Sequence, residues 1–218
     1  MGRGFPLPAR AVKETHMTTP APSALGNIDE LFAASPSDLT TAGGLWYAPF
    51  GTALPTDVDE PLNPAFKNFG FVSNKGVKVK IDGKTNPIEV WGGDEIGSLR
   101  DKFAVEYSMA LFQVLSPVVN AAIFGPANVS TAAATAEHGK RLKVAITNKL
   151  PKRCSLVLDA VYEDKIIRQV AQMAQLSDLA DITLVHNEPM ALEPTFRVLK
   201  GTDGVHVHQY SDDGVLAV

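Results

Sequence analysis

The C-terminal stretch GVHVHQYSDD holds residue types that could bind a metal ion. His206 and His208 are two positions apart, so they share one face if this stretch is a strand, and Asp212 and Asp213 follow closely. Two imidazoles and a carboxylate are a ligand set for a divalent ion, as in a cupin-like β-barrel metalloprotein. The pair lies near the C-terminal end, however, with no other His or Cys cluster in the sequence. We therefore favour a solvated terminal arm and expect no metal, keeping the metalloprotein as the alternative.

A second pair, His186 and Glu188, could supply a base and an acid from one side of a strand. Pro189 follows directly and ends strand pairing, so a structural turn is the better interpretation. Ser155 lacks the Gly-x-Ser-x-Gly context of a nucleophile, and the glycine pairs at 43–44 and 92–93 lack the phosphate-loop and dinucleotide fingerprints. The sequence therefore predicts no catalytic residue and no cofactor, and we expect the protein not to be an enzyme.

Three aromatic residues, Trp46, Tyr47 and Trp91, could form a stacking platform for a sugar or a base. No arginine cluster accompanies them, and aromatic residues make up only 7% of the chain, so core packing or subunit contact is favoured. The single cysteine, Cys154, excludes an internal disulfide. It lies in the apolar run CSLVLDAVY, which indicates a small buried hydrophobe in a reducing compartment.

Composition and charge narrow the class of protein. The 218 residues are 45% hydrophobic and 20% charged, which is ordinary for a globular fold. A net charge of -4 without a basic patch argues against a protein that coats nucleic acid. The longest apolar run, 114–125, is too short and too interrupted to span a membrane, and no apolar signal segment precedes it. We expect no membrane anchor.

The elements that must position these residues are mostly strands. Alternation is cleanest at 103–112, and Asp82-Gly83 is typical of a hairpin turn. No helix links each strand to the next, so the sequence predicts a mainly β fold, a sandwich or a barrel. The other expected strands are 45–48, 77–81, 87–91, 142–147, 154–162, 166–174, 181–187 and 195–199.

One helix is expected to flank the sheet. Residues 114–124 have apolar positions at helical spacing, Ser116 as a possible cap before Pro117, and a stop at Gly125-Pro126. A second short helix is predicted at 27–34, where an N-terminal Asn precedes acidic residues and spaced apolar ones.

The chain is expected to form one β-rich domain over 28–200, with an extended arm at 1–27 and a C-terminal arm at 201–218. Met17 offers an alternative start, so residues 1–16 are set aside as upstream sequence. The excursion 49–75 is a long loop with apolar residues that lack a period, which suggests that it packs against something. We predict a subunit interface formed by Trp46, Tyr47, Leu54, Val58, Leu62, Phe66 and Phe69.

The order of these segments resembles the major tail proteins of long-tailed bacteriophages, the subunits of the tail tube. The resemblance runs from about Gly26 to Lys200. It is carried by GFVSNKGVKV, then IEVWGG, then an alternating strand that leads into a helix ending in FG. One departure is Gln113, near the position where family members often show an acidic residue. The resemblance implies a β-sandwich or barrel-like sheet with a flanking helix.

The resemblance also implies a function. Six copies would close into a ring, and rings would stack into a tube in the virion, assembled in the host cytoplasm. The partners would be further copies of the chain and other tail proteins at the tube ends, with genome DNA passing through without sequence-specific binding. A net negative subunit suits such a conduit, because a wall that bound phosphates tightly would hold the genome. A secretion-system tube protein is the related alternative.

Overall fold

The computed structural model describes residues 30–36 and 43–215. The chain divides into two compact units, 1–31 and 32–218, and the fold below is that of the second unit. The arm expected at 1–27 lies outside the described residues, as does the start of the helix expected at 27–34. Residues 31–34 are not helical, and they lead into a short strand, β1 (Ser35–Pro36).

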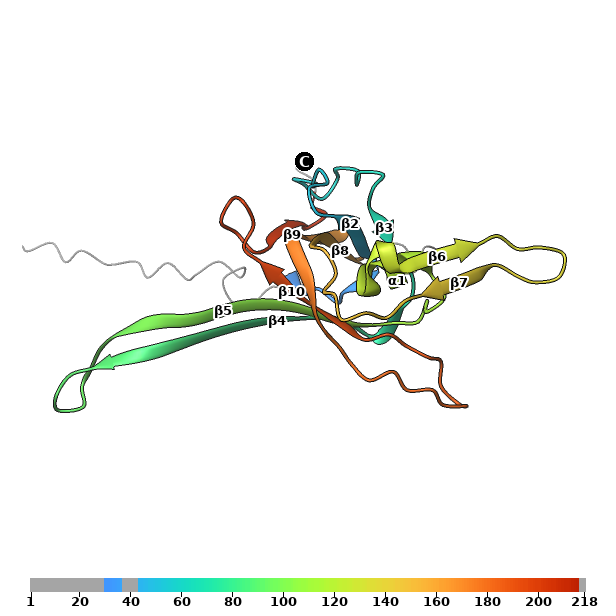
Figure 1. Ribbon diagram of the computed structural model, residues 1–218. Helices are drawn as coiled ribbons and strands as arrows, with labels where there is room; N and C mark the ends of the chain where they lie inside the picture. Colours follow the sequence, from blue (N-terminus) through green and yellow to red (C-terminus); the bar gives the residue numbers. More distant parts are fainter. Residues whose placement is uncertain (1–29, 37–42, 216–218) are drawn as a thin grey trace, which may run out of the picture. The chain divides into compact units, whose positions relative to one another are not determined.

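The described residues form one antiparallel nine-stranded sheet and a small two-stranded one (Figure 1). The main path runs β3-β2-β8-β9-β10-β5-β4, and β1 joins it by pairing with β8, as β11 does by pairing with β9. The strands of the main path are β2 (Leu45–Pro49), β3 (Lys67–Asn68), β4 (Val72–Glu89), β5 (Glu95–Leu111), β8 (Cys154–Tyr162), β9 (Lys165–Leu179) and β10 (Pro194–Leu199). The last strand is β11 (His208–Asp212), and the small sheet holds β6 (Val129–Ala132) and β7 (Arg141–Val144).

The expected helix is present as α1 (Pro117–Phe124). Pro117 suits the first position of a helix, because a backbone N–H at that position would have no partner within the helix and proline has none. The proline ring also holds φ near the helical value. The helix ends at Gly125, whose φ of 90° favours glycine and whose N–H donates to the Ala121 carbonyl at 3.0 Å. Val119 and Ile123 are buried in the main core. The predicted mainly β fold with one flanking helix is confirmed.

The main core is an aromatic and aliphatic layer between the sheet and α1. Tyr107, Phe69 and Phe196 are its largest fully buried side chains. The rings of Phe69 and Phe196 stack with centroids 6.2 Å apart, and Tyr47 lies 5.7 Å from Phe69. Such aromatic packing combines a large buried area with a favoured ring geometry. It joins the long loop, β5 and β10 in one cluster.

Several predicted elements differ in the structure. The hairpin turn expected at Asp82-Gly83 is wrong: β4 is one strand that contains the expected strand 77–81 and residues 87–89 of the expected strand 87–91, and Gly83 pairs with Phe103. The turn lies at 90–94, where Gly92 and Gly93 have positive φ values and the Val90 N–H donates to the Asp94 carbonyl. Glycine adopts positive φ values without steric cost, so Gly92 and Gly93 allow the chain to reverse here, whereas Gly83 has no positive φ.

Three further segments depart from the expected pattern. Residues 181–187 are not a strand in the structure. In contrast, 129–132 and 208–212 are strands, although they were expected to be loop and arm. Within the described part of the chain, no helix is long and apolar enough to cross a membrane.

Two phenylalanines on the same loop provide a matched test of the core. Phe69 is fully buried, whereas Phe71 is 55% exposed. Replacing Phe69 with Ala should lower the free energy of unfolding by about 3–5 kcal/mol, because a buried ring leaves a cavity. Phe71→Ala should change it by less than about 0.5 kcal/mol. Urea unfolding of both variants measures the difference, and equal effects would contradict this placement of the core.

Candidate functional site

The two C-terminal histidines have separate partners. The His206 ring stands edge-on to Phe103, with centroids 4.9 Å apart. His208 Nε2 lies 2.5 Å from the Asp203 carboxylate, and the hydrogen bond from His208 is the main cause that lowers the Asp203 pKa. Among the described residues, no group of three or more His, Cys, Asp or Glu side chains is placed to hold a metal ion. The two imidazoles therefore contribute to packing around β11.

The other candidate catalytic side chains are either buried in the fold, as Ser155 and Cys154 are, or exposed in a loop, as His186 and Glu188 are. The Ser155 hydroxyl is buried and donates to the Gln172 carbonyl at 2.8 Å. Cys154 is buried beside it, and desolvation raises the pKa of its thiol to about 12. A thiol with so high a pKa stays neutral and unreactive near neutral pH. His186 and Glu188 lie in an exposed loop.

The seven residues predicted as a subunit interface pack largely inside their own subunit. Phe69 lies in the main core, and Tyr47 packs against it. Phe66 lies in a second cluster with Ala48, Val157 and Val170 on the sheet, and Trp46, Leu54 and Leu62 pack against that cluster. Val58 is also buried. Phe66, Phe69 and Val58 thus offer almost no surface to a neighbour, because the long loop folds back over its own sheet.

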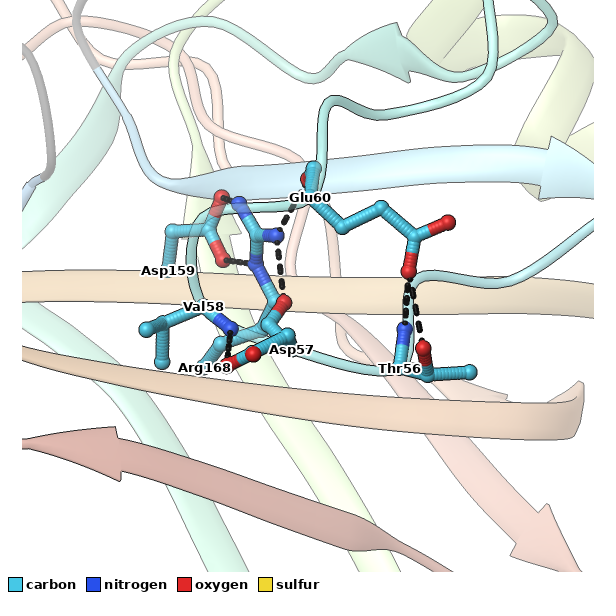
Figure 2. A network of polar contacts seen from close by, with 6 residues as sticks. All are labelled: Thr56, Asp57, Val58, Glu60, Asp159 and Arg168. Carbon is cyan, nitrogen blue, oxygen red and sulfur yellow. Dashed lines mark hydrogen bonds and ion pairs between the residues drawn. The ribbon is translucent and has the colours of Figure 1, made fainter.

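A buried ion pair fixes that loop to the sheet (Figure 2). Arg168 of β9 binds Asp159 of β8 through two contacts, Nε to Oδ1 at 2.7 Å and Nη2 to Oδ2 at 3.1 Å. Its Nη1 donates to the backbone carbonyls of Asp57 at 2.9 Å and Glu60 at 2.7 Å. One guanidinium therefore satisfies a carboxylate and two loop carbonyls, which is the fork geometry that arginine provides.

The loop has further contacts of its own around this anchor. The Glu60 carboxylate accepts hydrogen bonds from the Thr56 N–H at 2.6 Å and the Thr56 hydroxyl at 2.9 Å, and these bonds lower the Glu60 pKa. Gly44 of the neighbouring segment accepts a hydrogen bond from the Asp159 N–H at 2.6 Å. A Cβ atom at Gly44 would overlap the Asp159 carbonyl oxygen, so only glycine allows this close approach.

A long exposed surface among the described residues is the distal part of the β4–β5 hairpin, residues 82–103. The two strands run side by side to a shared turn (Figure 1), and β4 pairs with β5 alone. Trp91 at the turn is fully exposed. The other large apolar side chains that this segment exposes are Ile88, Val90, Ile96, Leu99 and Phe103.

A bulge near the middle of the hairpin changes which face is apolar. Lys84 pairs with Lys102 and Thr85 with Arg100, so Asp101 is an extra residue in β5. Before the bulge, Val79 and Ile81 share a face with their partners Tyr107 and Val105. Beyond it, that face carries Thr85, Arg100, Pro87 and Ser98, whereas the opposite face carries Ile88 and Leu99. The distal half therefore presents its apolar side chains away from the face that continues into the core.

This hairpin was not predicted as a site. The sequence feature that could have indicated it is the cluster IEVWGGDEI. In this cluster, apolar residues lie on both sides of a Gly-Gly turn and do not have helical spacing. Period two alone could not locate the surface, because the bulge at Asp101 breaks the period.

The comparison with protein families gives one decisive match. A family model described as "Phage tail tube protein" matches residues 34–215, which is most of the chain. The chain belongs to the phage tail tube protein family. As a tail tube protein, it is a structural component of the virion and not an enzyme, and it assembles with other copies and with tail proteins.

Solved structures include a match to the cryo-EM structure of the anti-feeding prophage cap, described as the tube-terminating cap. The match covers 84% of this chain and 96% of that chain, with 8% sequence identity and a TM-score of 0.39. No curated protein matches the sequence.

The Arg168 anchor makes a stability prediction for the tail tube subunit. Arg168→Met leaves the Asp159 carboxylate buried without its cation and leaves two loop carbonyls without a donor. Breaking a buried pair from one side costs about 3–5 kcal/mol in the free energy of unfolding. Arg141→Met, on the exposed strand β7, should change it by less than about 0.5 kcal/mol. Urea unfolding compares the two, and a similar small loss in both would show that the pair does not hold the loop.

Proposed function

We propose that this tail tube protein forms hexameric rings that stack into the tail tube, and that genome DNA passes through the tube without sequence-specific binding. The observation that carries the proposal is the β4–β5 hairpin, which has a long unpaired strand edge and exposed apolar side chains in one segment. The number six and the passage of DNA rest on the resemblance to tail proteins.

The unpaired edge supports assembly because an open strand is a template for pairing with another chain. The outer edge of β4 has no partner among the described strands, although β4 is the longest strand of the sheet. Monomeric proteins usually protect such an edge with very short strands or with a covering loop. A closed ring removes edges by pairing each subunit with the next.

The exposed apolar residues support the same conclusion. Trp91, Ile96 and Leu99 lie in one hairpin end, and side chains of this size are seldom clustered on the surface of a protein that acts alone. Burying each one at a subunit boundary contributes about 1.5–3 kcal/mol. Every subunit of a ring repeats the contact, so the effect is multiplied through the assembly.

The charge of the chain is compatible with a conduit for DNA. A net charge of -4 provides no excess of cations that would bind phosphates and retain the genome. The hairpin itself carries both signs, with Lys80 near Asp82 and Glu106 at 3.6 and 4.0 Å. Exposed pairs of this kind within one subunit contribute little energy.

The test is polymerisation of a folded hairpin variant. We expect the unsubstituted protein to form rings or tubes in electron micrographs and large species in sedimentation. The double variant Ile96→Ser and Leu99→Ser should keep its β-type circular dichroism and cooperative melt. Its critical concentration for tube growth should rise about tenfold or more, because two apolar contacts are lost per subunit.

The control is Leu115→Ser, at a side chain that is 80% exposed outside the hairpin. This variant should polymerise like the unsubstituted protein. Only monomer at every concentration of the unsubstituted protein would contradict the proposed function, and equal loss in both variants would contradict the role of the hairpin.

A further inference from the structure

The connection between β9 and β10 is an extended excursion without internal pairing. It leaves the sheet after Ala180, whose N–H donates to the Glu193 carbonyl at 3.1 Å, and it returns at Leu192, which pairs with Leu111. Within the described part of the chain, no backbone hydrogen bond involves residues 181–191. Residues 181–189 are all exposed. Among the residues that the structure describes, the backbone groups of this segment therefore have no hydrogen-bond partner.

The sequence of this segment, DITLVHNE at 181–188, is nonetheless that of a strand. Ile182, Thr183 and Val185 are β-branched, and such residues favour extended backbone. Leu184 is 76% exposed although it is a large apolar residue. A segment with strand propensity and apolar side chains that forms no ladder lacks a partner strand, not the ability to pair.

The outer edge of β4 offers such a partner on a second copy of the chain. Its backbone is unpaired on that side over most of the strand, and Pro87 within it is of the type found on edge strands. The edge strand is also exposed along residues 80–90. An added strand would supply the missing hydrogen bonds in the manner of β-augmentation.

The charges of the two segments are complementary. Segment 181–187 carries Asp181 and is followed directly by Glu188, while 77–84 of β4 carries three lysines and one aspartate, a charge of +2. Among the described residues, Lys78 and Lys84 form no ion pair, and neither do Asp181 and Glu188. Complementary charge favours the correct encounter and disfavours pairing of like segments.

We propose that residues 181–187 become a β-strand on assembly by pairing with the outer edge of β4 in a second copy of the chain. This inference rests on the proposed tube function and identifies the strand that joins one subunit to the next. The contact is heterologous, because a segment of one copy meets a different segment of the other. Such contacts continue from subunit to subunit and close into a ring where the rotation allows.

Cysteine cross-linking tests the pairing directly. The double variant Thr183→Cys and Lys80→Cys, polymerised and treated with a short bis-maleimide at pH 7, should give a ladder of covalent dimers, trimers and higher species. Each single variant should give at most dimers, because one cysteine per chain cannot extend a ladder. Thr135→Cys with Lys80→Cys is the positional control, since Thr135 lies in the exposed loop between β6 and β7. The native Cys154 is buried and neutral, so it does not interfere.

A second variant removes the capacity to pair. Val185→Pro deletes a backbone donor in the segment, so tube growth should be lost while the thermal melt of the subunit stays unchanged. Ala134→Pro, in the β6–β7 loop, is the matched control and should polymerise normally. If Val185→Pro lowers the melting temperature of the subunit, the cross-linking experiment alone tests the pairing, because its cysteine variants do not depend on a destabilising substitution.

The outcomes separate this inference from the tube function. Tubes that form normally without a ladder from the Thr183 and Lys80 positions would overturn the pairing while leaving the tube function intact. Failure of the unsubstituted protein to form any ring or tube would contradict the proposed function, and this inference with it.

Discussion

The unpaired outer edge of β4 is the constraint on which the account of this protein depends. The strands β8 and β9 have neighbours on both sides, and β5 pairs with β10 at residues 105–108 as well as with β4. On β4 one side is satisfied by β5, and the other is left to solvent or to a second chain. Exposed apolar residues lie on the same hairpin. The unpaired strand edge and the exposed apolar side chains, which both favour association, are therefore in one element.

The contacts of the long loop support the proposal that assembly uses the hairpin. Arg168 and Asp159 hold the loop carbonyls of Asp57 and Glu60, and Phe66 and Phe69 fill two clusters beneath the loop. A segment that contributes buried side chains to the core cannot offer those side chains to a neighbour. The loop is therefore part of the folding unit, whereas the hairpin and segment 181–187 are the parts for which we propose contacts between subunits.

Much of the fold could be predicted from the sequence because the strands that form the core alternate cleanly. Residues 103–111 of the alternating run lie within β5, residues 154–162 are β8, and Pro117 with Gly125 delimits α1. These signals are local and depend on period two or on helix-end chemistry. The loop with Phe66 and Phe69 carried no period, so its apolar residues could be assigned to a neighbour or to the core with equal physical support.

The interaction surface was harder to predict because its determinants are not local. The register shift at Asp101 decides which face of the hairpin carries Ile88 and Leu99, and such a bulge is visible only in the paired strands. Segment 181–187 was predicted as a strand from its residues, and the single subunit does not form it. Strand propensity indicates that a segment can pair, but it does not indicate which strand is the partner. That depends on the three-dimensional arrangement of the strands in the subunit and in the assembly.

Amide hydrogen exchange, compared between dispersed subunits and polymer, tests whether subunits join through the edge of β4. We expect the amides of residues 181–187, and the outward-facing amides of β4 near Lys80 that do not point toward β5, to exchange rapidly in the subunit and to become protected in the polymer, because both acquire hydrogen-bonded partners there. Core peptides of β8 and β9 should be protected in both states. Protection that is unchanged at both segments, with new protection over the loop 50–66 instead, would contradict the claim that subunits join through the edge of β4.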